Sequence, residues 1–239
     1  GTDILHFGIG DPDLPTPDHI INACCKAAKD PENHRYPSYQ GMLSFREAVS
    51  ERYKRDRKVE LDPEREIITL IGSKEGIHNV NFSLIDKGDV VLNPDPCYPV
   101  YYTGTIIAGG EPFPMPLKEK NSFLPNLESI PNDKVKKAKL MWINYPNNPT
   151  SSIAKKSFFK EAIDFAFDNG LAICSDEAYS KIVLDKTKIT SLLEVKGGRE
   201  VGIVFDSLSK TYNMTGWRIG YALGNEDLIQ SLGKIKTNV

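Results

Sequence analysis

The chain has 239 residues, of which 40% are hydrophobic and 26% are charged, and its formal net charge is −2. This composition is that of an ordinary globular protein with one large domain and a sizeable core. It excludes the basic face that nucleic acids require, and no apolar run reaches the length of a membrane span. No secretory leader pattern opens the chain, so we expect a soluble, cytoplasmic protein.

The cysteines and histidines give little support to a metal site. Four cysteines occur, in no C-x-x-C or zinc-like spacing, and the four histidines form no H-E-x-x-H motif. We therefore expect no metal, and we expect Cys24, Cys25, Cys97 and Cys174 to be small buried side chains in a reducing compartment.

The predicted elements begin with an extended Gly- and Pro-rich segment up to Pro17. Helices are predicted from residue 17 or 18 to about 29 and from 41 to about 57, with a loop at 35–41. Strand and helix patterns then alternate. Strands are predicted at 66–71, 89–93, 111–116, 138–144, 171–175, 202–205 and 218–223, and helices at 74–84, 98–108, 155–169 and from 226 onward. This alternation predicts a three-layer α/β/α fold with a mostly parallel central sheet, whose ligands bind at the carboxyl ends of strands.

The segment 207–220 gathers polar groups between two apolar runs and is the strongest candidate for chemistry. It contains Lys210, the hydroxyls of Ser207 and Ser209, and Arg218, whose planar guanidinium suits a phosphate. A solvated loop is the ordinary alternative, since a second Ser-Lys pair occurs at residues 73 and 74.

Other polar clusters follow other predicted strands. The segment 72–76, with Ser73 and Lys74, lies where a strand leads into a helix, so it is either an anion site or a simple helix cap. Asp176 follows an apolar strand and needs a cation, such as a protonated heteroaromatic nitrogen, unless it is itself protonated or caps a helix. Tyr179 and Asn148 can donate hydrogen bonds to a phenolic oxygen, but a core aromatic and an ordinary turn are their alternatives.

Taken together, these groups match the requirements of pyridoxal 5'-phosphate (PLP). This cofactor has an aldehyde that reacts with lysine, a ring nitrogen, a phenolate oxygen, a flat face and a phosphate. The motifs Asn148-Pro-Thr, Asp176-x-x-Tyr179 and Ser207-x-Ser-Lys210, with Arg218 eight residues later, resemble those of class I/II aminotransferases of the fold-type I PLP family. The resemblance runs from about residue 7 to the last residue.

The resemblance implies a role for each site residue. Lys210 would form an imine with the aldehyde and move the substrate proton. Asp176 would pair with the ring nitrogen. Tyr179 and Asn148 would hold the ring oxygen, and Tyr98 would stack on the ring. The phosphate contacts would be Ser73, Lys74, Ser207 and Arg218, with Ser209 a weaker candidate, and Tyr36 would reach the phosphate of a neighbouring subunit in a homodimer. Gly10 would contact the substrate carboxylate, and Lys74, Tyr98 and Asn148 would line the substrate site. The substrates would be an amino acid and a 2-oxo acid.

Five segments, at 8–17, 34–42, 70–76, 143–150 and 207–220, are most similar to one bacterial subgroup that transfers an amino group from a diamino dicarboxylic acid to 2-oxoglutarate. The chain departs from the family at Cys97, Ser151 and Ser152, where glycine is common. The family also continues into a C-terminal domain with the arginine that binds the α-carboxylate. We therefore expect residues 1–30 to belong to a small domain, residues 31–239 to form the PLP-binding large domain, and the C-terminal small domain to be absent. A PLP-binding remnant without catalysis, and an aminotransferase or lyase acting on a different amino acid, remain as alternatives.

Overall fold

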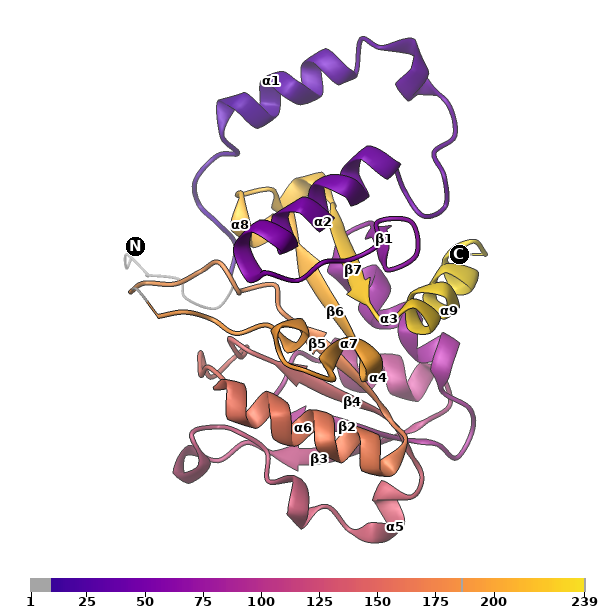
Figure 1. The fold of residues 1–239 in the computed structure, drawn as a ribbon, viewed down its shortest axis with the longest axis vertical. Coiled ribbons are helices and arrows are strands. Elements are labelled where there is room, and N and C mark those ends of the chain that lie inside the picture. The colour runs from indigo at the N-terminus through magenta and orange to yellow at the C-terminus, as the bar shows by residue number, and fades with distance from the viewer. Residues whose placement is uncertain (1–9, 186, 239) are drawn as a thin grey trace, which may run out of the picture.

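The structure, a computed structural model, describes residues 10–185 and 187–238 and is built on a seven-stranded sheet (Figure 1). Its strand order is β1-β7-β6-β5-β4-β2-β3. β7 pairs antiparallel with both β1 and β6, and the other pairings are parallel. The seven predicted strands and the mostly parallel sheet are thus confirmed. Their bounds are β1 (Ile67–Leu70), β2 (Val90–Asp95), β3 (Glu111–Pro116), β4 (Ala138–Asn144), β5 (Ala172–Asp176), β6 (Gly202–Ser207) and β7 (Gly220–Gly224).

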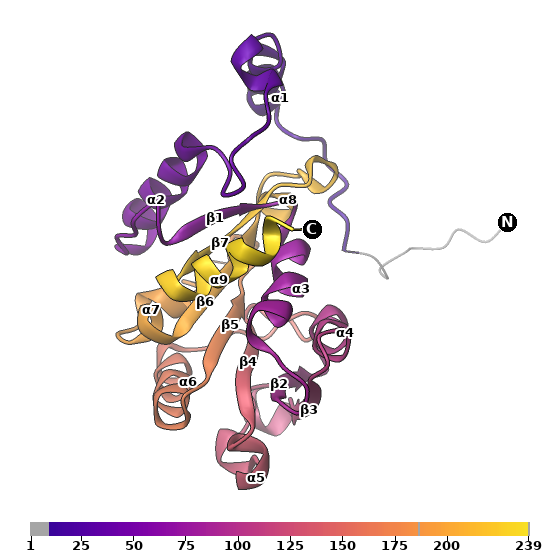
Figure 2. The ribbon, with the colours of Figure 1, turned by 90° about the vertical axis from the view of Figure 1, so that its right-hand side faces the viewer.

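Helices cover both faces of the sheet, which confirms the three-layer arrangement. Figure 2 shows α2 and α6 on one side of the sheet and α3 and α4 on the other. The six predicted helices are α1 (Asp18–Ala27), α2 (Leu43–Arg57), α3 (Ser73–Leu84), α4 (Val100–Ile107), α6 (Lys156–Asn169) and α9 (Glu226–Lys236). The short elements were not predicted: α5 (Asn132–Val135), α7 (Gly198–Val201), α8 (Leu208–Thr211), η1 (Pro31–His34), η2 (Glu119–Asn121), η3 (Leu127–Ser129), η4 (Leu192–Glu194) and η5 (Thr215–Trp217).

The core consists of two apolar layers, one on each side of the sheet. In β4, Met141 and Ile143 join the layer beneath α2 and α6, whereas Leu140 and Trp142 join the layer beneath α3, α4 and α9. Successive strand side chains point to opposite faces, so a strand covered on both sides reads as a continuous apolar run. The core therefore holds the strand ends, and the polar loops that follow them, in fixed positions.

Helix α1 stands apart from the sheet in both views (Figures 1 and 2) and has no buried residue. The expectation of four buried cysteines is wrong for two of them, because Cys24 and Cys25 are exposed on this helix; Cys97 is half-buried and Cys174 is buried. The first nine residues of the predicted small domain lie outside the described residues. Among the residues that are described, no helix is long and apolar enough to cross a membrane.

Candidate active site

A cavity of about 550 Å³ lies at the carboxyl edge of the sheet, where five predicted polar loops meet. These loops follow β1, β2, β4, β5 and β6. Strand β7 runs in the opposite direction and begins at the same edge, as the pairing of Ser207 with Gly220 shows. The cavity is lined by Gly10, Asp11, Gly72, Ser73, Lys74, Tyr98, Tyr101, Asn144, Asn148, Asp176, Ala178, Tyr179, Ser207, Ser209, Lys210, Thr215 and Arg218.

Eleven of the twelve residues singled out in the sequence therefore lie around one cavity. Tyr36 does not, because it is fully exposed in the loop between η1 and α2. Its predicted contact involves a second subunit.

Lys210 lies on α8, a single turn that starts directly after β6. Ser207 caps this turn, since its Oγ accepts a hydrogen bond from the Ser209 N–H at 3.1 Å. The half-buried Lys210 ammonium donates to the carbonyl of Gly10, which lies 200 residues earlier in the chain. This contact brings the N-terminal segment across the cavity to the turn that carries the lysine.

One end of the cavity is built to hold an anion. Helix α3 begins at Ser73 with no side-chain cap, so its first N–H groups point outward with the positive end of the helix dipole. Arg218 lies beside it in a left-handed conformation with φ 56° and donates from Nη1 to the Thr215 carbonyl at 2.8 Å. A Cβ at Gly72 would lie only 2.5 Å from Arg218 Nη2, so glycine permits this approach.

Tyr98 and Lys74 form the wall next to the anion end. The Lys74 ammonium lies 5.7 Å from the centroid of the Tyr98 ring, within cation–π range. The Tyr98 ring meets that of Tyr101 edge to face, with centroids 5.9 Å apart. An aromatic ring and a lysine ammonium thus line the same part of the cavity.

Asp176, the last residue of β5, is a buried acid that lines the cavity. Its Oδ2 accepts a hydrogen bond from the Tyr101 hydroxyl at 2.8 Å, and its Oδ1 accepts one from the Ala178 N–H at 3.3 Å. Burial raises the pKa of Asp176 to about 6, although these hydrogen bonds oppose the shift. Within the described part of the chain no lysine or arginine forms an ion pair with it. Such a carboxylate is suited to a cationic ligand group.

Asn144 joins the ends of β4 and β5 and was not predicted as a site residue. Its side chain donates to the Asp176 carbonyl at 2.8 Å and accepts from the Asn148 N–H at 2.7 Å. The loop with Asn148 is therefore fixed to the strand with Asp176, and Tyr179 lines the cavity from the next turn. Burial raises the pKa of Tyr179, and the nearby Asp176 adds to the shift, so its hydroxyl stays protonated.

Sequence reasoning also missed Tyr101, which lines the cavity. Tyr98 lies in the turn before α4, and Tyr101 in the first turn of the helix. Their separation of three residues, which brings side chains together in a helical turn, was the available signal. An amide that ends an apolar strand was the corresponding signal for Asn144.

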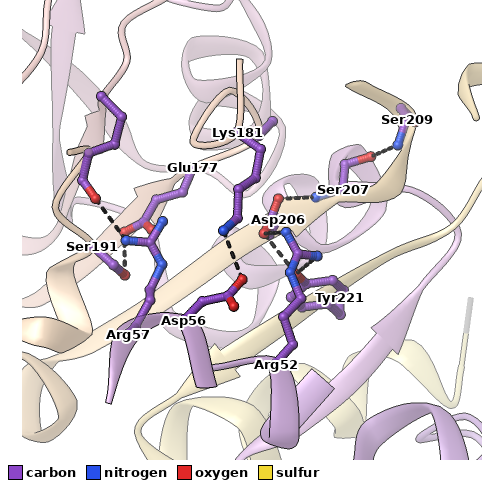
Figure 3. Close-up of polar contacts among 12 residues, drawn as sticks. Arg52, Asp56, Arg57, Glu177, Lys181, Ser191, Asp206, Ser207, Ser209 and Tyr221 are labelled. Carbon is purple, nitrogen blue, oxygen red and sulfur yellow. Dashed lines mark hydrogen bonds and ion pairs between the residues drawn. The ribbon is translucent and has the colours of Figure 1, made fainter. Parts of the chain in front are cut away.

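Beneath the cavity, a buried carboxylate supports the lysine turn (Figure 3). Asp206 accepts from the Tyr221 hydroxyl at 2.7 Å and from the Ser207 N–H at 2.7 Å, and burial raises its pKa. Arg52 of α2 donates to the Tyr221 hydroxyl at 3.1 Å and lies 4.0 Å from Asp206. Helix α2 is thereby connected to the residue that caps α8.

A second buried acid, Glu177, holds the loop that contains Tyr179. Its Oε1 accepts hydrogen bonds from Ser175 Oγ, Ser191 Oγ and the Leu192 N–H, each at 3.0 Å. Burial raises the pKa of Glu177 to about 7, and the charge of Arg57, which Figure 3 shows nearby, opposes the shift. Glu177 thus connects the segment just before Tyr179 to the start of η4 at Ser191 and Leu192.

A second concavity, of about 580 Å³, lies between the end of α2 and α7 and is rich in lysine and arginine. Its two arginines are already paired: Arg57 with Glu194 at 2.6 Å, and Arg199 with Glu66. It contains none of the predicted site residues. The cavity at the sheet edge is therefore the candidate active site.

The sequence and the fold place the chain among the class I and II aminotransferases. The sequence pattern of the family described as aminotransferase class I and II matches residues 2–239, and the chain belongs to that family.

Within this family, the chain is similar in sequence to aminotransferases of one kind. The chain is 56% identical to the LL-diaminopimelate aminotransferase of Aquifex aeolicus and 55% identical to that of Desulforudis audaxviator, over its whole length. It spans 62% and 61% of the length of these two proteins. It also superimposes on the substrate-bound BacF structure from Bacillus subtilis with a TM-score of 0.96 and 39% identity, covering 99% of this chain and 60% of that one.

Proposed function

We propose that this chain is the cofactor-binding part of a PLP-dependent aminotransferase. The observation that carries the proposal is the buried carboxylate of Asp176, which faces the same cavity as the Lys210 amine and the anion cradle of α3 and Arg218. A protonated ring nitrogen would supply the cation that Asp176 lacks among the described side chains. The phosphate would accept hydrogen bonds from the first turn of α3 and from Arg218. The donor set therefore fits PLP.

Each residue would have a distinct task. When bound, PLP supplies an aldehyde that reacts with amines and a ring that withdraws electrons from the substrate α-carbon. Lys210 would bind that aldehyde covalently and, once displaced, its Nζ would take the α proton and return it. Asp176 would keep the ring nitrogen protonated, and the hydroxyl of Tyr179 and the amide of Asn148 would donate to the ring oxygen. Tyr98 would cover one face of the ring.

The anion contacts would come from Ser73, Lys74, Ser207 and Arg218, with Ser209 in a weaker role. Ser209 is buried, and its N–H is already bonded to Ser207, so it would act mainly through the turn. Gly10 would contact the substrate carboxylate from the N-terminal segment.

We further propose that residues 1–30 belong to a small domain and residues 31–239 to the large domain. The absence of buried residues on α1 supports this division, because a helix of this length normally packs against a partner. The full exposure of Tyr36 agrees with a contact to a second subunit in a homodimer. The four free thiols agree with the cytoplasm.

For the substrates we propose LL-diaminopimelate and 2-oxoglutarate, in lysine biosynthesis. The support is the identity above 50% to two LL-diaminopimelate aminotransferases along the whole chain. Lys74 lines the cavity and is suited to a distal carboxylate, but that contact would also suit glutamate or aspartate. A PLP-binding remnant without turnover, and an aminotransferase or lyase for another amino acid, are the competing functions.

Two measurements on the purified chain separate these functions. Visible spectra with PLP, before and after borohydride, report the imine, and a coupled assay with LL-diaminopimelate and 2-oxoglutarate reports transamination. Imine and turnover together support the proposal, and Lys210→Ala should then abolish both. An imine without turnover on any amino acid supports the remnant, whereas turnover on a different amino acid alone corrects the substrate. Absence of the imine overturns PLP binding altogether.

A further inference from the structure

Tyr101 is the side chain whose hydroxyl donates to the carboxylate of the buried acid of the cavity, and its ring is packed in the core. It is completely buried, and its ring stacks on Trp142 with centroids 4.6 Å apart and planes 7° from parallel. Its carbonyl accepts a hydrogen bond from Thr105 Oγ1 at 2.8 Å. The packing of the ring therefore directs the hydroxyl toward the Asp176 carboxylate.

The surroundings of Asp176 leave few other groups to stabilise its charge. Asp206, on the neighbouring strand β6, raises the pKa of Asp176 further, and Tyr179 and Cys97 are the other titratable groups close to the Tyr101–Asp176 pair. Apart from the Ala178 N–H, the described residues provide one hydrogen-bond donor to the carboxylate, the Tyr101 hydroxyl.

The hydroxyl can serve as a donor at every working pH. Burial and the adjacent carboxylate both raise the pKa of Tyr101 well above its ordinary value. The proton therefore stays on the phenol, and Asp176 remains the acceptor. A donor that never ionises favours the charged form of its partner.

We infer that Tyr101 is a positioning residue whose hydroxyl orients the Asp176 carboxylate and sustains its negative charge toward a cation in the cavity. Tyr101 also meets the ring of Tyr98 edge to face. Tyr101 in the first turn of α4 would thus orient the acid and also contact the stacking aromatic in the turn before the helix. The inference rests on the proposed function only in taking that cation to be a protonated pyridine nitrogen.

The test is a carbon-13 NMR titration of the Asp176 carboxyl in cofactor-free protein. Removing one hydrogen bond to a charged group should raise this pKa by about one to two units, so we expect such a shift in Tyr101→Phe. Tyr145→Phe is the matched control, because Tyr145 is also buried but donates to the Phe123 carbonyl at 2.8 Å and does not line the cavity. It should leave the titration of Asp176 unchanged.

Replacement of Tyr101 by 3-fluorotyrosine provides a second test that retains the hydroxyl and nearly the same volume. A more acidic phenol is a stronger donor, so the pKa of Asp176 should fall, opposite to the effect of Tyr101→Phe. An unchanged titration in both variants would overturn the inference, as would equal shifts in Tyr145→Phe. Because the protein is cofactor-free, these results stand whether or not PLP binds, and failure of PLP to bind would overturn the proposed function alone.

Discussion

Replacing Gly72 with alanine tests the anion end of the cavity. Gly72 precedes α3 with φ 73° and ψ 155°, a conformation that is essentially restricted to glycine. Imposing it on alanine costs about 1–3 kcal/mol of stability. The new Cβ would also lie 2.5 Å from Arg218 Nη2, the end of a flexible side chain, so the guanidinium would be displaced from the cradle.

We expect Gly72→Ala to lower the free energy of unfolding by that amount and also to weaken PLP binding. Loss of one charge-assisted hydrogen bond, about 1.5–3 kcal/mol, corresponds to an increase in Kd of roughly 10- to 150-fold. Urea denaturation and PLP titration measure the two effects separately. The control is Gly170→Ala, which also has positive φ, 65°, but has nothing within 4 Å of the added Cβ. It should cost stability and leave the Kd unchanged. If Gly72→Ala likewise left the Kd unchanged, Arg218 would not bind the phosphate.

Two further substitutions test the buried carboxyl group of Glu177 and the proposed contact of Lys74 with the substrate. The pKa of Glu177 is raised from 4.5 to about 7, so the folded protein binds this proton more tightly than the unfolded chain does. The charged form of Glu177 therefore lowers the free energy of unfolding above pH 7. This loss of stability disappears as the pH falls toward 4.5 and the carboxyl group becomes protonated in the folded protein. Glu177→Gln should accordingly be more stable than the wild type by up to about 3 kcal/mol above pH 7 and similar to it near pH 4.5, by urea denaturation; a difference independent of pH would contradict this reasoning. Lys74→Ala, assayed with saturating PLP in protein with measurable turnover, should raise the KM for LL-diaminopimelate several-fold with little change for alanine as amino donor. Equal effects on both substrates would show that Lys74 does not contact the distal carboxylate.

The strands and the site location could be predicted because both depend on local pattern. Apolar runs bounded by turns marked the strands, and the rule that ligands bind at carboxyl ends of parallel strands brought distant loops together. Strand order could not be predicted, because a residue pattern does not specify which strands become neighbours. The antiparallel direction of β7, which brings Arg218 to the edge of the sheet where the cavity lies, depends on which strands become neighbours.

The missed residues act through contacts between distant parts of the chain. Tyr101 has the sequence pattern of a core aromatic, and its hydroxyl acquires a role only because Asp176, 75 residues later, ends the strand beneath it. Helix α1 shows the converse. The sequence predicted the helix correctly, but none of its residues is buried, because a helical pattern does not specify what the helix packs against.

Lys210 is the residue proposed to bind PLP in the cavity at the sheet edge. Borohydride treatment in the presence of PLP, followed by proteolysis and mass spectrometry, tests this proposal directly. We predict that the phosphopyridoxyl mass is found on the peptide that contains Lys210, at one equivalent per chain, and that it is lost in Lys210→Ala. An adduct on Lys74 or on surface lysines alone, or an undiminished adduct in Lys210→Ala, would show that Lys210 does not bind the cofactor.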